Sequence, residues 1–444
     1  MNTERTALFS NAPVRKAVLT LAIPTVISQL ITVVYNMADT FFIGKLNDPL
    51  QVAAATVVMP CFMLLTGFAN LFGLGGSSLI SRCLGTDDQE KARHCASFCI
   101  WTGAAVALLY GIAVILLEPV LFPLLGASEG TWESCRQYAF WTIGVGAVPT
   151  VMNAELAHLI RAEGYSRPAG FGVAFGGVLN IILDPIFIFA LRLNIAGAAI
   201  ATMLSNLIAM GYFLGFLYHI RKNTVITPDP KAFSIRQHIP GEVLSVGLPG
   251  FVMTMMSTIS NGVLNHTVAG YSDTAIAGMG IAKKIDLLAY AIAQGMTQGT
   301  LPLIGYNYTS SSLKRMKAGI KTAFAYSFLV ACAGTVLLWT LAAPISRCFI
   351  ADAETVRYGQ HFLKIICLAC PTTAINFMVI TVFQAIGKRV QPLCLSLLRK
   401  GSLDVVFMLL LNHAVGVSGI AWATPFADWI AFGISAALIV PYLK

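Results

Sequence analysis

Apolar residues occur along this chain in long runs that short polar segments separate. About twelve of these runs reach the roughly 20 residues that a helix needs to cross a bilayer. The pattern predicts an all-α polytopic membrane protein with very little chain outside the membrane. The predicted spans are residues 15–43, 52–80, 92–118, 133–160, 168–191, 195–220, 241–268, 275–305, 317–343, 356–386, 391–413 and 418–442.

The first run contains a stripe of polar residues as well as apolar ones. Gln29, Thr32, Asn36 and Asp39 recur three or four residues apart, so their side chains project from one side of the helix. A carboxylate inside a membrane span is tolerated where it faces a bundle interior or a wet cavity. Asp39 is therefore a candidate ion-handling residue. The alternative is that it lies at the membrane surface and caps the following loop.

The fifth run carries a second candidate acid. Asn180 and Asp184 are four residues apart, so they share a helical face. Pro185 cannot donate a backbone hydrogen bond, which leaves the carbonyl of Ile181 free at membrane depth. With the hydroxyl of Thr202 in the sixth run, these oxygens suit a sodium ion or a proton. The alternative is that they only join helices through hydrogen bonds.

Asp39 and Asp184 can bind a proton or cation together if they face one cavity. Two carboxylates held away from water repel each other, so each favours a bound proton or cation. A transported cation then competes with a proton or sodium ion for the same negative charge. This competition predicts an antiporter whose cation-coupling site is Asp39, Asn180, Asp184 and Thr202, with no cofactor besides the coupling ion.

The two halves of the chain are similar at a shift of about 222–225 residues. RAEG at 161–164 aligns with QAIG at 384–387, and IAGAAIAT at 195–202 aligns with VSGIAWAT at 417–424. Six helices per half return the chain to the same side, so the halves are expected to be parallel repeats. We expect an N-terminal lobe, a cytoplasmic linker and a C-terminal lobe, formed by residues 1–221, 222–240 and 241–444.

The second half repeats the polar stripe without its acid, since Leu264 replaces the aspartate beside Asn261 and Asn265. Other charged residues lie in its spans: Lys283, Lys284, Asp286, Arg399, Lys400, Asp404 and Asp428. Lys400 and Asp404 are four residues apart and can pair. The sequence leaves open whether these charges fix helix packing or line a substrate path. It also leaves open whether Glu155 and His158, one turn apart in the fourth run, pair or form a gate.

Substrate sites in repeated transporters lie near the membrane midplane, between or within the repeats. Asp404 aligns with Asn180 when the two halves are compared. This alignment and the polar stripes predict a substrate path through the helices that carry them. Methionine and aromatic side chains suit flat hydrophobic cations. The predicted path residues are Gln29, Thr32, Tyr35, Asn36, Asn153, Met256, Asn261, Asn265, Asn376 and Asp404.

Composition excludes a soluble protein, because the chain is 57% hydrophobic and only 11% charged, against about 25% charged in soluble domains. The net charge of +9 is distributed over alternate loops, which argues against a nucleic-acid surface. The same asymmetry predicts a multi-pass protein of the cell membrane with both termini in the cytoplasm.

Four motifs together resemble one transporter family: YNMADTFFIG at 35–44, RAEG at 161–164, LNIILDPIF at 179–187 and GAAIAT at 197–202. They are similar to motifs of the multidrug and toxic compound extrusion family of bacterial type. The resemblance implies export of cationic drugs by a V-shaped pair of bundles, driven by a proton or sodium gradient. It also implies that Asp39, Asn180, Asp184 and Thr202 form the coupling-cation site. The acid that some relatives carry in the seventh helix is missing here.

Three functions compete at this point. We expect a secondary active antiporter, not an enzyme, that acts as a monomer in the bilayer on small organic cations. A flippase for lipid-linked sugars shares the two-bundle layout, and a large basic central cavity would favour it. A membrane-embedded enzyme or receptor would need catalytic groups or a folded domain in its loops, which are short.

Overall fold

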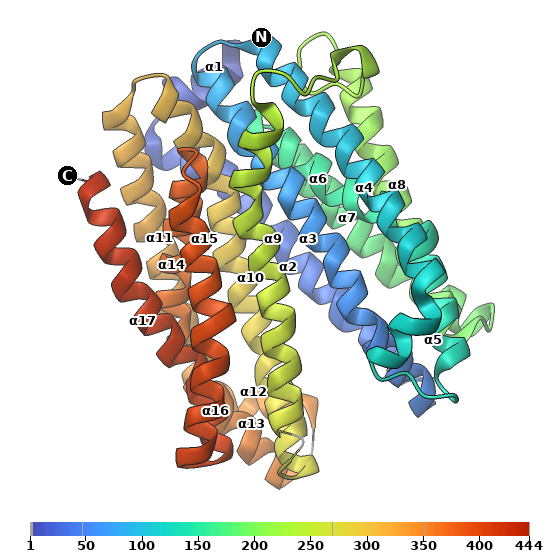
Figure 1. The fold of residues 1–444 in the computed structure, drawn as a ribbon. Helices are drawn as coiled ribbons and strands as arrows, with labels where there is room; N and C mark the ends of the chain where they lie inside the picture. Colours follow the sequence, from blue (N-terminus) through green and yellow to red (C-terminus); the bar gives the residue numbers. More distant parts are fainter. Residues whose placement is uncertain (1–2, 47, 269, 351, 444) are drawn as a thin grey trace.

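The computed structural model describes residues 3–46, 48–268, 270–350 and 352–443. The described chain folds into two helical bundles that touch at one end and lean apart toward the other (Figure 1). After the short α1 (Thr3–Ser10), the first bundle contains α2 (Val14–Gly44), α3 (Pro49–Gly85), α4 (Gln89–Leu124), α5 (Trp132–Ala139), η1 (Phe140–Val145), α6 (Ala147–Ala162), α7 (Ser166–Pro185), η2 (Ile186–Ala190) and α8 (Asn194–His219).

The second bundle begins after the short η3 (Pro230–Ala232) and repeats this arrangement. It contains α9 (Ile239–Val268), α10 (Asp273–Thr309), α11 (Leu313–Thr340), α12 (Ala342–Phe349), α13 (Ala353–Ile366), η4 (Cys367–Ala369), α14 (Cys370–Ala385), α15 (Val390–Ser396), η5 (Leu397–Leu403), α16 (Asp404–Val415) and α17 (Val417–Leu443).

The helices account for the expected all-α, twelve-span fold. Within the described residues, nine helices are long and apolar enough to cross a membrane. The helices α5–η1 and α6 together form a tenth span, which is bent by 48°. The charge-bearing α10, and α15 with η5 and α16, complete the twelve. These two spans carry Lys283 and Asp286, and Arg399 and Asp404, which is why their apolar pattern is weaker than in the other spans.

The repeat is visible in the backbone where α6 and α14 end. Gly164 and Gly387, the last residues of the aligned RAEG and QAIG motifs, have φ angles of +89° and +77°. A residue with a left-handed backbone conformation at the end of a helix is usually glycine, because glycine has no Cβ to clash. Both halves therefore end this helix with the same turn.

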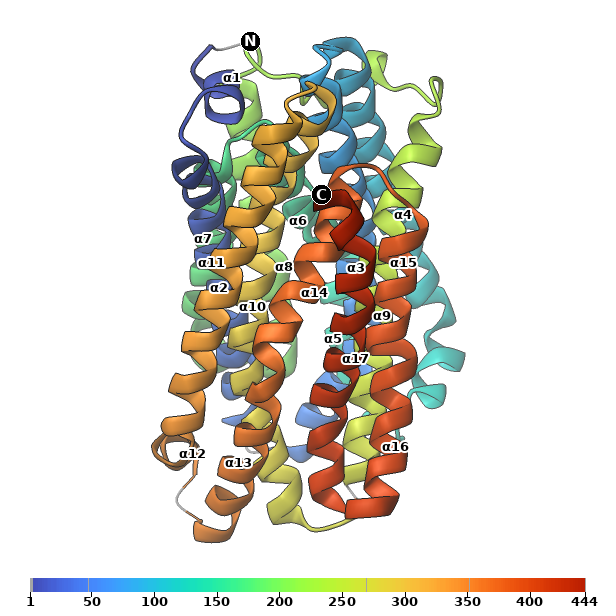
Figure 2. The same ribbon diagram turned by 90° about the vertical axis from the view of Figure 1, so that its left-hand side faces the viewer.

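The two bundles pack closely at their shared end, where α3 lies against α9 and α2 against α10. A Cβ placed on Gly247 would lie only 1.8 Å from the carbonyl oxygen of Leu71, so only glycine allows this approach of α9 to α3. Glu242 adds ion pairs to Arg82 at 3.3 Å and to Lys91 at 2.8 Å. We call this region the closed end. Figure 2 shows the side on which α2, α10 and α11 run next to one another.

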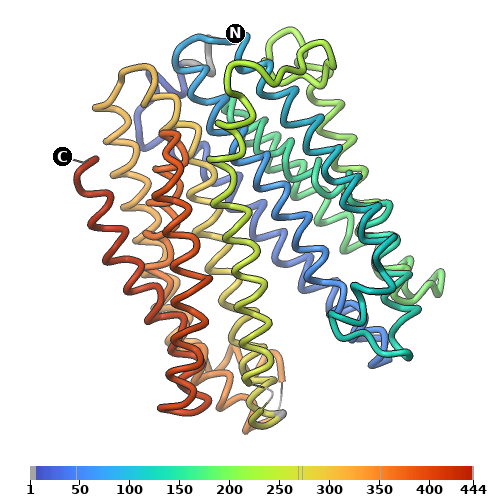
Figure 3. Tube along the Cα trace, viewed as in Figure 1, coloured from blue at the N-terminus to red at the C-terminus, as the bar shows by residue number. Residues whose placement is uncertain are grey.

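The first helix and the connector between the bundles both lie at the closed end (Figure 3). Phe9 stacks on Tyr306, and Arg315 Nε donates to the Phe9 carbonyl at 2.6 Å, so α1 is fastened to the second bundle. The connector is fastened to the first bundle, because the Glu163 carboxylate accepts hydrogen bonds from the Thr224 hydroxyl and the Val225 N–H.

Candidate cation and substrate site

Three of the four predicted cation-coupling residues lie together between α7 and α8. The Asn180 amide donates to Asp184 Oδ1 at 3.2 Å and lies 3.3 Å from the Thr202 hydroxyl. All three side chains are buried. After Pro185 the chain continues as the π-helical η2, which agrees with the predicted loosening of the helix at this proline.

Asp39 completes the group from α2, which packs along α7. Gly177 of α7 allows α2 to come close, because a Cβ at this position would lie only 2.9 Å from the ring of Tyr35. Tyr35 is one turn before Asp39 on α2. Asp39 and Asp184 are near enough for their charges to interact. The structure thus brings the two predicted acids to one place, and their functional role stays a prediction.

The hydrogen bonding of this group is incomplete. Asp39 Oδ1, Asn180 Oδ1 and Asp184 Oδ2 are buried acceptor atoms without a hydrogen-bond partner. A buried acceptor without a partner costs free energy, and a buried charge costs more. Two carboxylate oxygens, an amide oxygen and a nearby hydroxyl form a donor set that suits a hard cation such as sodium, or a proton.

A polar cavity of about 210 Å³ lies directly beside these residues. Its wall combines residues of α2, α3, α6, α7 and α8 with residues of α10, so both bundles contribute. Four predicted path residues and one predicted coupling residue line it: Gln29, Thr32, Tyr35, Asn153 and Asn180. Because Asn180 also bonds to Asp184, it connects the cavity to the acid pair.

Sequence reasoning missed most of the polar lining. The missed polar residues are Thr66, Asn70, Thr150, His158, Arg161, Ser205, Asn206, Gln294 and Gln298. A usable signal was present, since Thr66 with Asn70 and Gln294 with Gln298 are polar pairs four residues apart in long helices. Such pairs present one polar face, as in the stripe on α2.

Six other predicted path residues lie outside this cavity. Asn36 of α2 and Asn261 and Asn265 of α9 are exposed at the surface of their helices. Met256 of α9 packs against Gly401 of η5, within the second bundle. The remaining two, Asn376 and Asp404, belong to a separate network inside the second bundle.

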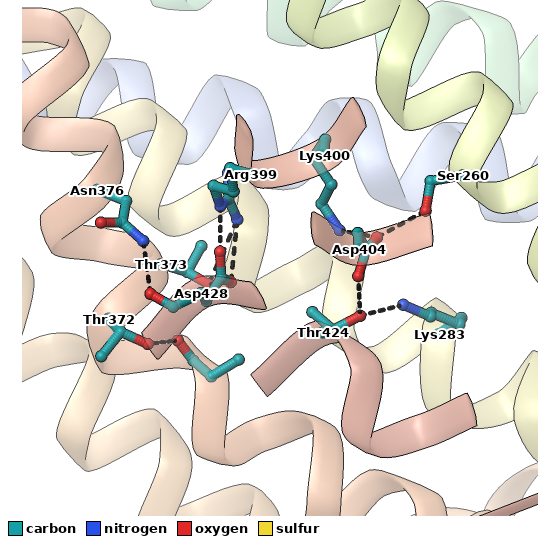
Figure 4. A network of polar contacts seen from close by, with 11 residues as sticks. Ser260, Lys283, Thr372, Thr373, Asn376, Arg399, Lys400, Asp404, Thr424 and Asp428 are labelled. Atoms are coloured by element: carbon teal, nitrogen blue, oxygen red, sulfur yellow. Dashed lines mark hydrogen bonds and ion pairs between the residues drawn. The ribbon is translucent and has the colours of Figure 1, made fainter. Parts of the chain in front are cut away.

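That network joins the buried charges of η5, α16 and α17 (Figure 4). Arg399 forms an ion pair with Asp428, whose carbonyl accepts from the Asn376 amide. The predicted pair of Lys400 with Asp404 is present at 3.2 Å. The Asp404 carboxylate also accepts from the hydroxyls of Ser260 and Thr424, at 2.6 and 3.1 Å. The Thr424 hydroxyl also accepts a hydrogen bond from Lys283 Nζ, at 3.4 Å.

The hollow beside Asp286 and Arg399 measures about 20 Å³. That volume accepts roughly one water molecule. In this conformation the charges of the second bundle bond to one another and to hydroxyl groups of neighbouring helices. A role for Asp404 or Asn376 in a substrate path stays a prediction.

Glu155 and His158, one turn apart on α6, do not pair. Both carboxylate oxygens of Glu155 are buried without a partner, and one points at Gly103 of α4. His158 instead lies beside Arg161, with 3.4 Å between His158 Nδ1 and Arg161 Nη1.

A two-bundle membrane fold with a polar cavity where the bundles meet, and an acid pair beside that cavity, is typical of membrane transporters. The sequence model of the MatE family matches residues 24–186 and 249–410, one match in each half. The chain belongs to the MatE family, the multidrug and toxic compound extrusion family that its motifs resemble. It is accordingly a membrane transporter and not an enzyme.

The similarity to known proteins covers the whole chain. The multidrug export protein MepA of Staphylococcus saprophyticus is 30% identical over 444 residues, which are 100% of this chain and 97% of that protein. MepA of Staphylococcus aureus is 28% identical over the same shares. An outward-facing structure of a multidrug resistance transporter of this family superposes with a TM-score of 0.90 at 25% identity, covering 100% of this chain and 99% of the other.

Proposed function

We propose that this protein is a secondary active antiporter that exports cationic and amphipathic organic compounds in exchange for protons or sodium ions. The observation that carries the proposal is the set of three unpartnered oxygens on Asp39, Asn180 and Asp184, connected to a polar cavity through Asn180. A proton or sodium ion that binds these oxygens neutralises one of the two negative charges. The printed names of the staphylococcal relatives support the multidrug part of the proposal.

The proposed exchange is a competition for negative charge. When the acids bind a proton or sodium ion, their net negative charge falls and they attract a cationic molecule in the cavity less strongly. When the ion leaves, the negative charge next to Asn180 is restored and favours the organic cation. No cofactor enters this cycle, and the protein is proposed to work as a monomer in the bilayer.

The orientation belongs to the same proposal. Basic residues gather at the closed end, among them Arg82, Lys91 and Arg315, and the cytoplasmic side of membrane proteins carries the excess of Lys and Arg. The closed end and both termini are therefore proposed to face the cytoplasm. In this conformation the bundles would be open to the outside.

A flippase for lipid-linked sugars is the alternative, and a large basic cavity would support it. The lining here consists mainly of amide and hydroxyl side chains, with Arg161 as its one arginine among the described lining residues. This composition favours small organic molecules over a diphosphate carrier.

The test is transport in everted membrane vesicles that contain a fluorescent organic cation, first with a pH gradient and then with a sodium gradient. Wild-type protein should respond to one of them. Asp39→Asn should abolish the gradient-driven movement at unchanged expression, whereas Glu129→Gln, which removes an exposed carboxylate, should not. Full transport by Asp39→Asn would refute the coupling role.

A further inference from the structure

The cavity contains one charged side chain that the exchange mechanism does not use. Arg161, in the last turn of α6, is 3% exposed and lines the cavity. Its Nε is buried and has no hydrogen-bond partner, and its Nη1 lies 3.4 Å from Nδ1 of His158. A guanidinium stays protonated in proteins and has only donors to offer. Arg161 therefore presents positive charge and unused donor capacity to the cavity.

The acids closest to Arg161 in the chain are directed elsewhere. Glu155 lies toward α4, with an oxygen against Gly103. Glu163 accepts hydrogen bonds from Thr224 and Val225 of the connector. Arg161 takes part in none of the ion pairs that the described residues form. Its charge is thus available to a molecule in the cavity.

Arg161 and Asn180, the lining residue that bonds to Asp184, lie toward different ends of the cavity. Asn153 of α6 is near Gly176, one turn before Asn180 on α7, which bonds to Asp184. Arg161 is eight residues further along α6 than Asn153, which corresponds to about 12 Å at 1.5 Å per residue. A molecule that extends through the cavity therefore meets Asn180, which bonds to Asp184, toward one end and the guanidinium of Arg161 toward the other.

We propose that Arg161, positioned by His158, forms an anion subsite that binds the carboxylate group of the transported molecule. The preferred substrates are zwitterionic amphiphiles, which place a cationic group toward Asn180 and a carboxylate on Arg161. This substrate class rests on the proposed export function. An arginine matches a carboxylate with two parallel charge-assisted hydrogen bonds, and a bound carboxylate supplies the partner that the buried Nε lacks.

The test compares two dyes that differ in one group: a rhodamine with a free ring carboxylate, and the methyl ester of the same rhodamine. Binding to the purified full-length protein in detergent is measured by fluorescence polarisation, without any ion gradient. Wild-type protein should bind the carboxylate form more tightly. Arg161→Gln should weaken binding of that form by about tenfold or more, the effect of one lost charge-assisted hydrogen bond. It should leave the ester within about twofold.

The controls separate this inference from the coupling mechanism and from loss of fold. Ester binding by Arg161→Gln reports that the variant is folded, Arg161→Lys should recover part of the discrimination, and the exposed Arg167→Gln should leave both affinities unchanged. Asp39→Asn should keep the difference between the dyes, even though it loses transport. Equal weakening of both dyes by Arg161→Gln, or no weakening of either, would overturn the subsite.

Discussion

The amide of Gln29 donates a 2.8 Å hydrogen bond to Oε1 of Gln298. The two residues are far apart in the chain, on α2 of the first bundle and α10 of the second, and both line the cavity. The bond therefore joins the bundles at the wall of the proposed substrate site. A movement that separates α2 from α10 has to break it, so this contact connects the cavity to the conformation of the transporter.

The coupling between these two glutamines is measurable. Gln29→Ala and Gln298→Ala should each lower stability, and the double variant should lose less than the sum, with a coupling of about 0.5–1.5 kcal/mol. Thermal unfolding in detergent, measured for the wild type, the two single variants and the double variant, gives this double-mutant cycle. Gln294 lines the same cavity one turn earlier on α10, so the cycle of Gln29→Ala with Gln294→Ala should be additive. Additivity in both cycles would contradict an energetic role for the bond.

Replacing Asp184 with asparagine should abolish gradient-driven export and preserve the fold. The substitution keeps the size of the side chain and removes a buried charge that interacts unfavourably with Asp39, so the thermal unfolding temperature should stay level or rise. Thr202→Val, which removes one hydroxyl of the group, should reduce export less. Vesicle transport assays at matched expression measure both, and unchanged export by Asp184→Asn would place the coupling site elsewhere.

The ion pair of Arg399 with Asp428 should be a strong determinant of stability. Both side chains are buried, at 2% and 1% exposure, so Asp428→Asn leaves an uncompensated guanidinium and should destabilise the protein by about 3–5 kcal/mol. The double variant Arg399→Met with Asp428→Leu should recover most of this loss. Lys284→Gln, at an exposed position on α10, is the control. A small effect of Asp428→Asn on thermal unfolding would disprove the stabilising role.

A side chain at Gly247 should disfavour the conformation described here. A Cβ there would lie 1.8 Å from the backbone oxygen of Leu71, so Gly247→Val forces α9 away from α3 at the closed end. Overpacking of this kind costs about 1–3 kcal/mol, which changes the ratio of conformations by about fivefold to about 150-fold. Electron paramagnetic resonance distances between labels on the two bundles would detect the shift.

The matched control for this substitution lies on the same helix. A Cβ at Gly262 of α9 meets no atom within 4 Å, so Gly262→Val should leave the distance distribution unchanged. Equal distributions for wild type and Gly247→Val would mean that the close approach of α9 to α3 does not hold the closed end together.

Local spacing was sufficient to predict contacts within one helix. Asn180 with Asp184, and Lys400 with Asp404, were expected from their separation of four residues, and both contacts are present. The same rule did not predict which partners would come from other helices. The bonds of Asp404 to Ser260, and of Asn153 to Asn206, join segments that no local pattern relates.

The sequence by itself determined the membrane class, the helices and the repeat, because burial of apolar side chains in lipid and the period of the α-helix act within each segment. The tertiary structure alone decided which polar residues face the cavity. Asn36 and Gln29 lie on one stripe of α2, yet Gln29 bonds to α10 and lines the cavity, whereas Asn36 is exposed. Helical periodicity sets the angles between side chains on one helix, whereas the packing of all the other helices sets how that helix is rotated and what it meets.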